Sequence, residues 1–218
     1  MRDYLILKLQ GPMQAWGRES FEGLRPSELF PGRSALLGLL GACLGIDRTD
    51  RRRLQDLAAS VSFAVRVDRQ GQKMTDYHTV KDAREDYRGL KSHNTIQTWR
   101  EYWQDACYTV AIWASRDNAP LHLAAIEQAI KQPIYTPVLG RRNCPLARPL
   151  FETKIAAESA LAALAQTGAN QGTLYSEENS PGAIPLKKRD VPIVHQPRQF
   201  ASRTVFMTAV QGALHVSE

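Results

Sequence analysis

The chain has 218 residues, of which 43% are hydrophobic, and a formal net charge of +6; its mean hydropathy is −0.36 and its pI is near 9.4. These values describe a globular protein with one large domain, or one domain with a small appended unit, and they favour a polyanionic partner without bearing on the fold. The longest apolar run, residues 35–46, contains glycines and is too short to cross a bilayer, and the first ten residues do not have the pattern of a signal peptide.

The three cysteines, Cys43, Cys107 and Cys144, are far apart and form no CxxC pair. This spacing argues against a disulfide framework and against a zinc site, and it favours a reducing cytoplasmic location. We therefore expect no metal and no cofactor. The glycines form neither a GxGxxG nor a Walker loop, so a nucleotide cradle is not expected either.

The first part of the chain predicts strand, helix and strand. Residues 4–9 alternate as a strand. Ser34 is a candidate N-cap for the helix that follows, and the glycines of that helix predict close packing against another backbone, because each costs about 1 kcal/mol relative to alanine. Residues 51–60 predict a short helix capped by Asp50. Residues 61–67 then alternate clearly as a second strand.

The next elements continue this pattern. Residues 108–114 alternate as a third strand. A helix opened by Asn118 and Pro120 ends before Pro133. Residues 134–139 predict a short strand, which we expect at a sheet edge because it carries a proline. The order strand, helix, strand, strand, helix, strand predicts an α+β fold with the split βαβ plan of ferredoxin-like and RNA-recognition (RRM-like) domains.

A long insertion separates the second strand of this plan from the third. Residues 1–139 are the predicted palm, and residues 69–107 are inserted in it where a tight hairpin is expected. The insertion holds several large aromatic residues, which favours an ordered, projecting lobe over disorder. Within it, residues 76–103 interleave cations with aromatic rings, a composition that suits unpaired nucleic acid. The alternative is a charged hairpin or helix with ordinary packing aromatics.

Residues 140–218 predict a C-terminal unit packed on the palm. Gly140 is followed by Arg141 and Arg142, and a glycine beside cations can bring the backbone close to a phosphate; an ordinary solvated turn explains the same residues. Residues 156–166 predict an alanine-rich helix. Turn-rich sequence and short strands follow, the last at 204–210, so a degenerate second β unit is expected.

Several runs of the sequence resemble a known family. They are GPMQAWG (11–17), RSALLGLLGACLGI (33–46), DYHTV (76–80), AREDYRGLKSHNTIQTWREY (83–102), YTPVLGRRNCPL (135–146), YSEE (175–178) and PRQFASR (197–203). They are similar to the CasD subunits of type I-E CRISPR Cascade complexes, in the repeat-associated RNA-binding (RAMP) superfamily. The resemblance implies a ferredoxin-like palm with a long β-hairpin thumb, which would be the insertion. It also implies that the chain holds the 5′ handle of the CRISPR guide RNA, caps the CasC filament, abuts CasA, and meets target DNA only through the complex.

The binding hypothesis gives roles to particular side chains. Arg84, Arg88, Lys91 and Arg100 are expected to neutralise handle phosphates or to grip a neighbouring subunit. Tyr77, Tyr87 and Trp99 are stacking candidates, although a core position is the favoured expectation for Trp99 because Ile96 lies three residues before it. The remaining candidates are Gln14 and Trp16 on the loop after the first strand, His78 and His93 as structural or RNA-contacting residues, and Arg141, Arg142, Arg198 and Arg203 along the palm.

Two other functions remain open from the residues. A metal-independent endoribonuclease that processes repeat RNA needs a base, an acid and a cation, and Tyr77-His78 together with Lys91-Ser92-His93 could supply these groups. In type I-E systems, however, the resemblance assigns the cutting to a separate subunit, CasE, so no catalytic residue is expected here. The third possibility is a purely structural capping protein whose charge serves solubility.

Overall fold

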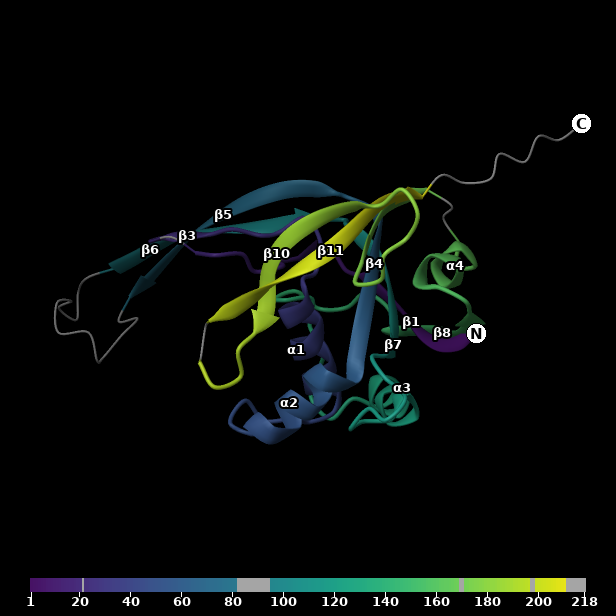
Figure 1. Ribbon diagram of the computed structural model, residues 1–218. Coiled ribbons are helices and arrows are strands. Elements are labelled where there is room, and N and C mark those ends of the chain that lie inside the picture. The colour runs from purple at the N-terminus through teal and green to yellow at the C-terminus, as the bar shows by residue number, and fades with distance from the viewer. Residues whose placement is uncertain (21, 82–94, 169–170, 197–198, 211–218) are drawn as a thin grey trace, which may run out of the picture.

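The structure, a computed structural model, describes residues 1–210 apart from 21, 82–94, 169–170 and 197–198 (Figure 1). The helices and strands, in chain order, are β1 (Arg2–Gln10), β2 (Met13–Gln14), β3 (Leu24–Arg25), α1 (Arg33–Cys43), α2 (Arg51–Ser60), β4 (Val61–Arg69), β5 (Gln72–Lys81), β6 (Thr95–Gln104), β7 (Cys107–Ala114), α3 (Leu123–Lys131), β8 (Phe151–Ala157), α4 (Ala160–Ala165), β9 (Gly172–Ser176), β10 (Ile184–Pro192) and β11 (Phe200–Val210).

These strands form two sheets. The larger has seven strands in the order β10-β11-β9-β4-β7-β1-β8, and every neighbouring pair is antiparallel. The smaller sheet is built on β6, with β5 along one edge and the short β2 and β3 along the other. The fold is therefore α+β, with a mostly antiparallel sheet, as the sequence predicted.

The large sheet is covered on both faces. On one face, Leu5, Leu7 and Leu9 of β1 pack with buried residues of α1, α2 and α3. On the other face, Tyr4 and Ile6 pack under the small helix α4. Figure 1 shows α1, α2 and α3 grouped together and α4 apart from them. Because β1 is buried on both sides, its middle reads as a nearly continuous apolar run.

The fourth strand beside β1 is not where the sequence analysis placed it. Residues 134–139 form no strand; Val138 makes only an isolated bridge to Pro145. The N–H groups of Ile134 and Tyr135 instead donate to the carbonyls of Cys43 and Ala42, each at 3.0 Å. They thereby satisfy carbonyls at the C-terminal end of α1 and cannot join a ladder. The strand that pairs with β1 is β8.

Three helices begin at other residues than predicted. The N-cap of α1 is Gly32, not Ser34, and the Arg33 N–H donates to Asp190 Oδ2 of β10 at 2.8 Å. Helix α3 begins at Leu123, after His122. Helix α4 begins after Ser159, because the two preceding alanines at 156–157 belong to β8. The predicted bounds of α2 and its Asp50 cap are confirmed.

Close packing accounts for only some of the glycines in and just after α1. A side chain at Gly45 would meet Ile134 at 2.8 Å, and the residue has φ +62°. At Gly38, however, a Cβ would find no atom within 4 Å among the described residues. Gly38 is exposed, so the prediction of close packing is wrong there.

The C-terminal segment adds strands to the same sheet. Residues 140–218 contribute β8 at one edge and β9, β11 and β10 at the other, and β9 pairs directly with β4. The predicted last strand at 204–210 is part of the longer β11. Among the described residues, no helix is long and apolar enough to span a membrane.

Candidate nucleic-acid interface

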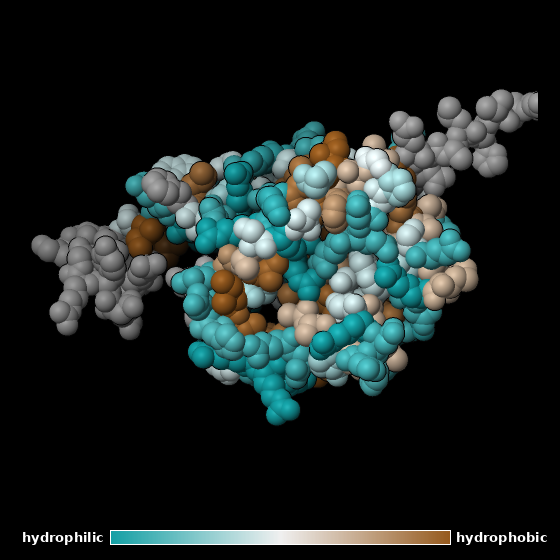
Figure 2. Space-filling view, viewed as in Figure 1, coloured by the Kyte–Doolittle hydropathy of each residue, from teal (hydrophilic) through white to brown (hydrophobic). Residues whose placement is uncertain are grey.

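The insertion between β4 and β7 is a β-hairpin, as the resemblance implied. Strands β5 and β6, here called the thumb, pair antiparallel from Gln72↔Gln104 to Lys81↔Thr95. The thumb projects from the end of the sheet where β4 ends and β7 begins, and it extends away from the helices (Figure 1). Figure 2 shows hydrophobic side chains on the projecting part of the hairpin, beside the grey trace. The turn of the hairpin lies outside the described residues.

One face of the thumb carries exposed aromatic rings. Tyr77 is 51% exposed and its cross-strand partner Trp99 is 44% exposed. Their ring centroids are 5.5 Å apart at an interplanar angle of 56°. The expectation that Trp99 lies in the core is therefore wrong. Because side chains alternate along β6, Trp99 points to the exposed face, whereas the preceding residue, Thr98, points to the other face and is buried.

The other face of the thumb mixes polar and apolar side chains. His78 is in contact with Asp76, which precedes it by two residues on β5. Arg100 lies opposite Asp76 in the register, and its Nε donates to Thr98 Oγ1 at 3.2 Å. Tyr77 and His78 are consecutive in a strand, so they point to opposite faces and cannot act on one phosphate together. In the structure, then, this half of the candidate ribonuclease set does not converge.

The base of the thumb is fixed by a partly buried carboxylate. Glu101 Oε2 accepts the Ser27 N–H at 3.0 Å and lies 2.8 Å from Lys73 Nζ. Burial alone would raise the pKa of Glu101, but the hydrogen bonds from Lys73 and Ser27 outweigh burial and lower it. The ionised carboxylate thus joins β5, β6 and the segment before α1.

Arg141 reinforces this base from the glycine–arginine loop. Its Nη1 donates to the Glu101 carbonyl at 2.9 Å and its Nη2 to the Arg25 carbonyl at 2.8 Å. The guanidinium also lies 4.5 Å from the centroid of the Tyr102 ring. Arg141 therefore bridges β6 and β3 through one hydrogen bond from each terminal nitrogen. Its neighbour Arg142 is exposed.

The backbone conformation of Gly140 lets this loop pack closely against the segment after β2. The residue has φ +92°, and a Cβ there would lie 1.7 Å from the Ala15 carbonyl oxygen. The close approach that the glycine permits is thus to the chain's own backbone after β2. The predicted approach to a phosphate is not the role that the structure gives it.

Gln14 and Trp16 are buried rather than presented to solvent. Gln14 is 0% exposed and Trp16 is 1% exposed. Gln14 Nε2 donates to the Ala106 carbonyl at 2.7 Å, and the Trp16 ring packs edge-on against Tyr108. Because both side chains lie inside the molecule, their predicted contact with RNA is not supported. The segment after β1 pairs with the edge of β6 as strand β2, which its sequence did not reveal.

Arg203 is engaged in an ion-pair cluster at the N-terminus of α1. It donates to both oxygens of Asp190, at 2.6 and 2.7 Å, and to Glu177 at 3.1 Å. Arg33 donates to the same Glu177 oxygen at 2.6 Å. The Asp190 pKa is lowered although burial opposes the shift, because the hydrogen bond and charge of Arg203 stabilise the carboxylate. The predicted phosphate contact by Arg203 is therefore replaced by an internal one.

A further charged cluster lies on the second face of the sheet, and the sequence analysis missed it. Arg66 is 0% exposed, and it donates to Asp68 Oδ1 and to the Leu164 carbonyl, both at 2.5 Å. Lys8 Nζ lies 2.6 Å from Asp68 Oδ2, and the Thr109 hydroxyl donates to the same oxygen at 2.6 Å. The polar residues Arg66 and Asp68 at alternate positions of β4 were the available signal. Arg66 binds carbonyls at the end of α4, so its role is to hold that helix on the sheet.

The remaining candidates fall on parts of the chain without a described structure. They are Arg84, Tyr87, Arg88, Lys91, His93 and Arg198, which lie outside the described residues. Their roles remain predictions. Of the candidates that are described, Tyr77 and Arg142 are exposed, while His78 and Arg100 are half-buried on the other face of the thumb.

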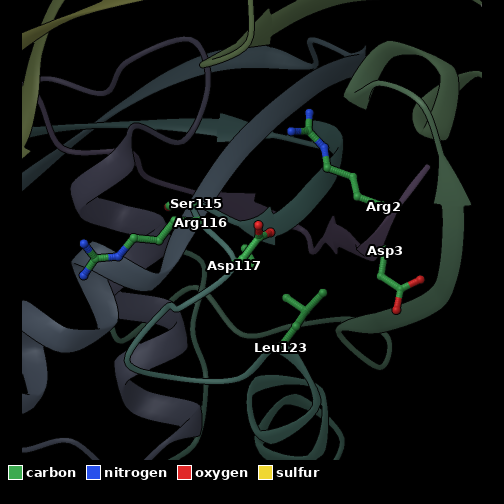
Figure 3. A pocket seen from close by; sticks show the side chains of 7 residues that line it. Arg2, Asp3, Ser115, Arg116, Asp117 and Leu123 are labelled. Carbon is green, nitrogen blue, oxygen red and sulfur yellow. The ribbon is translucent and has the colours of Figure 1, made fainter.

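A cavity of about 340 Å³ lies at the opposite end of the sheet from the thumb. It is lined by residues at the start of β1, after the end of β7 and at the start of α3, among them Arg2, Asp3, Arg116 and Asp117 (Figure 3). Two cations and two carboxylates balance in charge. Strand β7 spans the distance between the two ends, roughly 25 Å, so this cavity is not part of the thumb region.

Comparisons with known proteins agree with this architecture. The model of the CRISPR-associated protein (Cas_Cas5) family matches residues 4–206. The CRISPR system Cascade subunit CasD of Escherichia coli (strain K12) is 51% identical over 227 residues, covering all of both chains. A chain of a CRISPR RNA-guided surveillance complex superposes with a TM-score of 0.76 at 26% identity, over 96% of this chain and 90% of that one. A crystal structure of a Cas protein gives 0.66 at 28% identity, over 95% of each chain.

Proposed function

This chain belongs to the CRISPR-associated protein (Cas_Cas5) family, and we propose that it is the subunit of a Cascade complex that holds the 5′ repeat-derived handle of the guide RNA without cutting it. The observation that carries the proposal is the 51% identity, over the full length of both chains, to the CasD subunit of Escherichia coli Cascade. That identity also confirms the resemblance drawn from the sequence runs.

The topology supports a ferredoxin-like palm beneath the thumb. Strands β4, β7, β1 and β8 lie side by side in that order, each antiparallel to its neighbour. Helix α1 follows β1 and helix α3 follows β7, so each connects strands that are separated by one other strand. This is the arrangement of two interleaved split βαβ units. In this proposal β9, β10 and β11 are the degenerate C-terminal β unit, joined to the palm edge at β4.

The internal contacts of Arg141 and Arg203 bear on which cations hold the RNA. Arg141 and Arg203 are bound to groups of the chain itself, whereas three cationic candidates lie between β5 and β6 and one, Arg142, lies in the glycine–arginine loop. We therefore assign the handle phosphates to Arg84, Arg88 and Lys91 with Arg142 at the palm. The family relationship extends the proposal to a position at the end of the CasC filament, next to CasA.

Charge reversal tests this assignment. Replacing Arg84, Arg88 and Lys91 by glutamate in the complex with guide RNA should weaken handle binding and reduce the slope of log K against log salt by roughly 2, since each contact to a single-stranded phosphate contributes about 0.7. The matched control reverses three exposed arginines at the start of α2 and just before it, Arg48, Arg51 and Arg52. Equal salt slopes in the two triple variants would refute the assignment.

The non-catalytic part of the proposal has its own test. Repeat RNA incubated with the purified chain in chelator should stay intact, because Tyr77 and His78 lie on opposite faces of β5. Specific cleavage that disappears in His78→Ala or His93→Ala would show instead that the chain is a ribonuclease.

A further inference from the structure

The thumb is joined to the large sheet by two short breaks in a pair of strands that otherwise runs on from one sheet into the other. The last register pair of β4 with β7 is Arg69↔Cys107, and the first pair of β5 with β6 is Gln72↔Gln104. The angle between the thumb and the large sheet therefore depends on the backbone between these pairs. That backbone is called the elbow below, and it consists of residues 70–71 and 105–106.

Each half of the elbow contains one residue in the left-handed backbone conformation. Gly71 has φ +73° and Asp105 has φ +53°. Glycine adopts such angles freely, whereas other residues do so at a cost that is lowest for asparagine and aspartate. Asp105 is exposed, so its side chain does not fill the core. Both residues are thus of the types that a bend with two left-handed positions requires.

The two halves of the elbow are packed directly against each other. A Cβ at Gly71 would lie 2.0 Å from the Gln104 carbonyl oxygen and 2.7 Å from the Ala106 nitrogen. These are backbone atoms, which cannot rotate away as a flexible side chain can. A change of angle in one half of the elbow therefore has to displace the other half.

Hydrogen bonds tie the second half of the elbow to its neighbours. The Asp105 N–H donates to the Pro12 carbonyl, between β1 and β2, at 3.2 Å. The Asp105 carbonyl accepts from Arg69 Nε, at the end of β4, at 2.6 Å. The carbonyl of the buried Ala106 accepts from Gln14 Nε2 at 2.7 Å. The elbow is thus held from β4 on one side and from the β1–β2 connection on the other.

We propose that the elbow sets the angle of the thumb in the free chain, with Gly71 and Asp105 as its positioning residues, so that the thumb stands at its RNA-binding angle before RNA binds. A segment that is already ordered loses less conformational freedom on binding, which strengthens binding without a new contact. The geometric part of the proposal concerns the isolated chain. Its consequence for RNA rests on the proposed function.

A distance between the thumb and the large sheet's helices measures the angle. Spin labels are attached at Thr79→Cys on β5 and at Ala59→Cys on α2, both exposed positions, while the three native cysteines are buried. Pulsed electron paramagnetic resonance gives the distribution of distances in the full-length chain, with and without handle RNA. Handle RNA binding and thermal unfolding are measured for each variant in parallel.

Matched substitutions separate backbone conformation from charge and from stability. Asp105→Asn and Asp105→Gly keep a residue that tolerates the left-handed conformation, whereas Asp105→Val places a β-branched residue there. Gly71→Ala adds the clash with the other half of the elbow. Its control is Gly182→Ala, because Gly182 also has a positive φ, +75°, but a Cβ there would meet none of the described atoms within 4 Å.

The wild type should show one narrow distance that does not change when RNA is added. Asp105→Asn, Asp105→Gly and Gly182→Ala should keep it, whereas Asp105→Val and Gly71→Ala should broaden the distribution. Their apparent Kd for handle RNA should rise by the inverse of the fraction that keeps the wild-type distance, about tenfold for a fraction of about one tenth. A role in stability alone would lower the unfolding temperature without this broadening.

Four results would overturn the proposal. They are a broad wild-type distribution that narrows only with RNA, wild-type distances in both elbow variants, an Asp105→Asn variant that behaves as Asp105→Val, and broadened variants that bind handle RNA as the wild type does. If Gly71→Ala does not fold, the Asp105 series decides alone. A wild-type chain with one narrow distance that does not bind handle RNA would refute the proposed function, and with it the elbow's consequence for RNA, but not the preset angle.

Discussion

Arg141 and Arg142 are adjacent in the sequence, and replacing each by alanine distinguishes a structural arginine from a free one. Arg141 makes two hydrogen bonds to backbone carbonyls, at 2.9 and 2.8 Å, and lies 4.5 Å from the Tyr102 ring centroid. Arg142 is exposed. The two variants remove the same charge from the same loop, so any difference between them reflects these contacts.

The magnitude follows from the contacts that Arg141→Ala removes. Each hydrogen bond to a partly buried carbonyl contributes about 1 kcal/mol, and the cation–π contact adds about 0.5–1 kcal/mol. The loss is therefore about 2–3 kcal/mol of unfolding free energy, which for a chain of this size lowers the melting temperature by roughly 5–10 °C. Arg142→Ala should stay within about 0.5 kcal/mol of the wild type.

Urea and thermal unfolding, followed by circular dichroism, measure both variants. Arg141→Lys should recover less than half of the loss, because one ammonium group cannot reproduce the geometry of the planar fork that reaches two strands. If Arg141→Ala and Arg142→Ala unfold at the same urea concentration, Arg141 does not brace the thumb. If Arg141→Ala keeps full stability but reduces the salt slope of RNA binding, the arginine contacts phosphate after all.

Three further predictions concern other parts of the chain. Asp190→Asn should lose about 2–4 kcal/mol at neutral pH, since it leaves Arg203 without its main partner; Asp190→Ala tests the same contact without an amide. The pKa of Asp190 is lowered, so the ionised carboxylate stabilises the fold above about pH 4, and this stabilisation is lost as the pH falls further. The stabilities of wild type and Asp190→Asn should therefore converge in acid denaturation. Parallel curves would contradict the ion pair. Gly38→Ala should stabilise the chain by about 0.5–1 kcal/mol, because a Cβ there finds open space; destabilisation would mean that the α1 surface is covered. Burial raises the pKa of the thiols of Cys43, Cys107 and Cys144, that of Cys43 to about 11. Native protein at pH 8 should therefore react with a thiol reagent only slowly. Rapid labelling would show that the core opens.

The regular elements could be predicted because their signals are local. The alternation of residues 61–67 predicted β4, and Asp50 marked the start of α2 through its own hydrogen bond to the Arg53 N–H. The insertion was recognisable from its length and its aromatic residues. Strand β8 was not predicted, although Phe151, Thr153 and Ile155 alternate along it; the predicted edge strand was the segment at 134–139.

The candidate site was harder to predict because burial and pairing are not local properties. Gln14 and Trp16 have the character of binding residues, but Gln14 pairs at the edge of β6 and both side chains are buried. Arg203 is basic in the sequence, yet its partner Asp190 lies on the neighbouring strand. Trp99 was expected in the core from its spacing to Ile96, a helical spacing that does not apply to a strand.

The sequence by itself determined the family, the order of the main strands and helices, and the presence of an ordered excursion between β4 and β7, because these depend on periodicity and on long runs of specific residues. Only the tertiary structure decided which cations are free. Arg66, Arg141 and Arg203 are bound to carbonyls or carboxylates from distant parts of the chain, and the strength of a charge toward a partner depends on whether another group already neutralises it. It likewise decided that Gly71 meets the backbone of Gln104 and Ala106, since both pairs of strands must form before these residues come together.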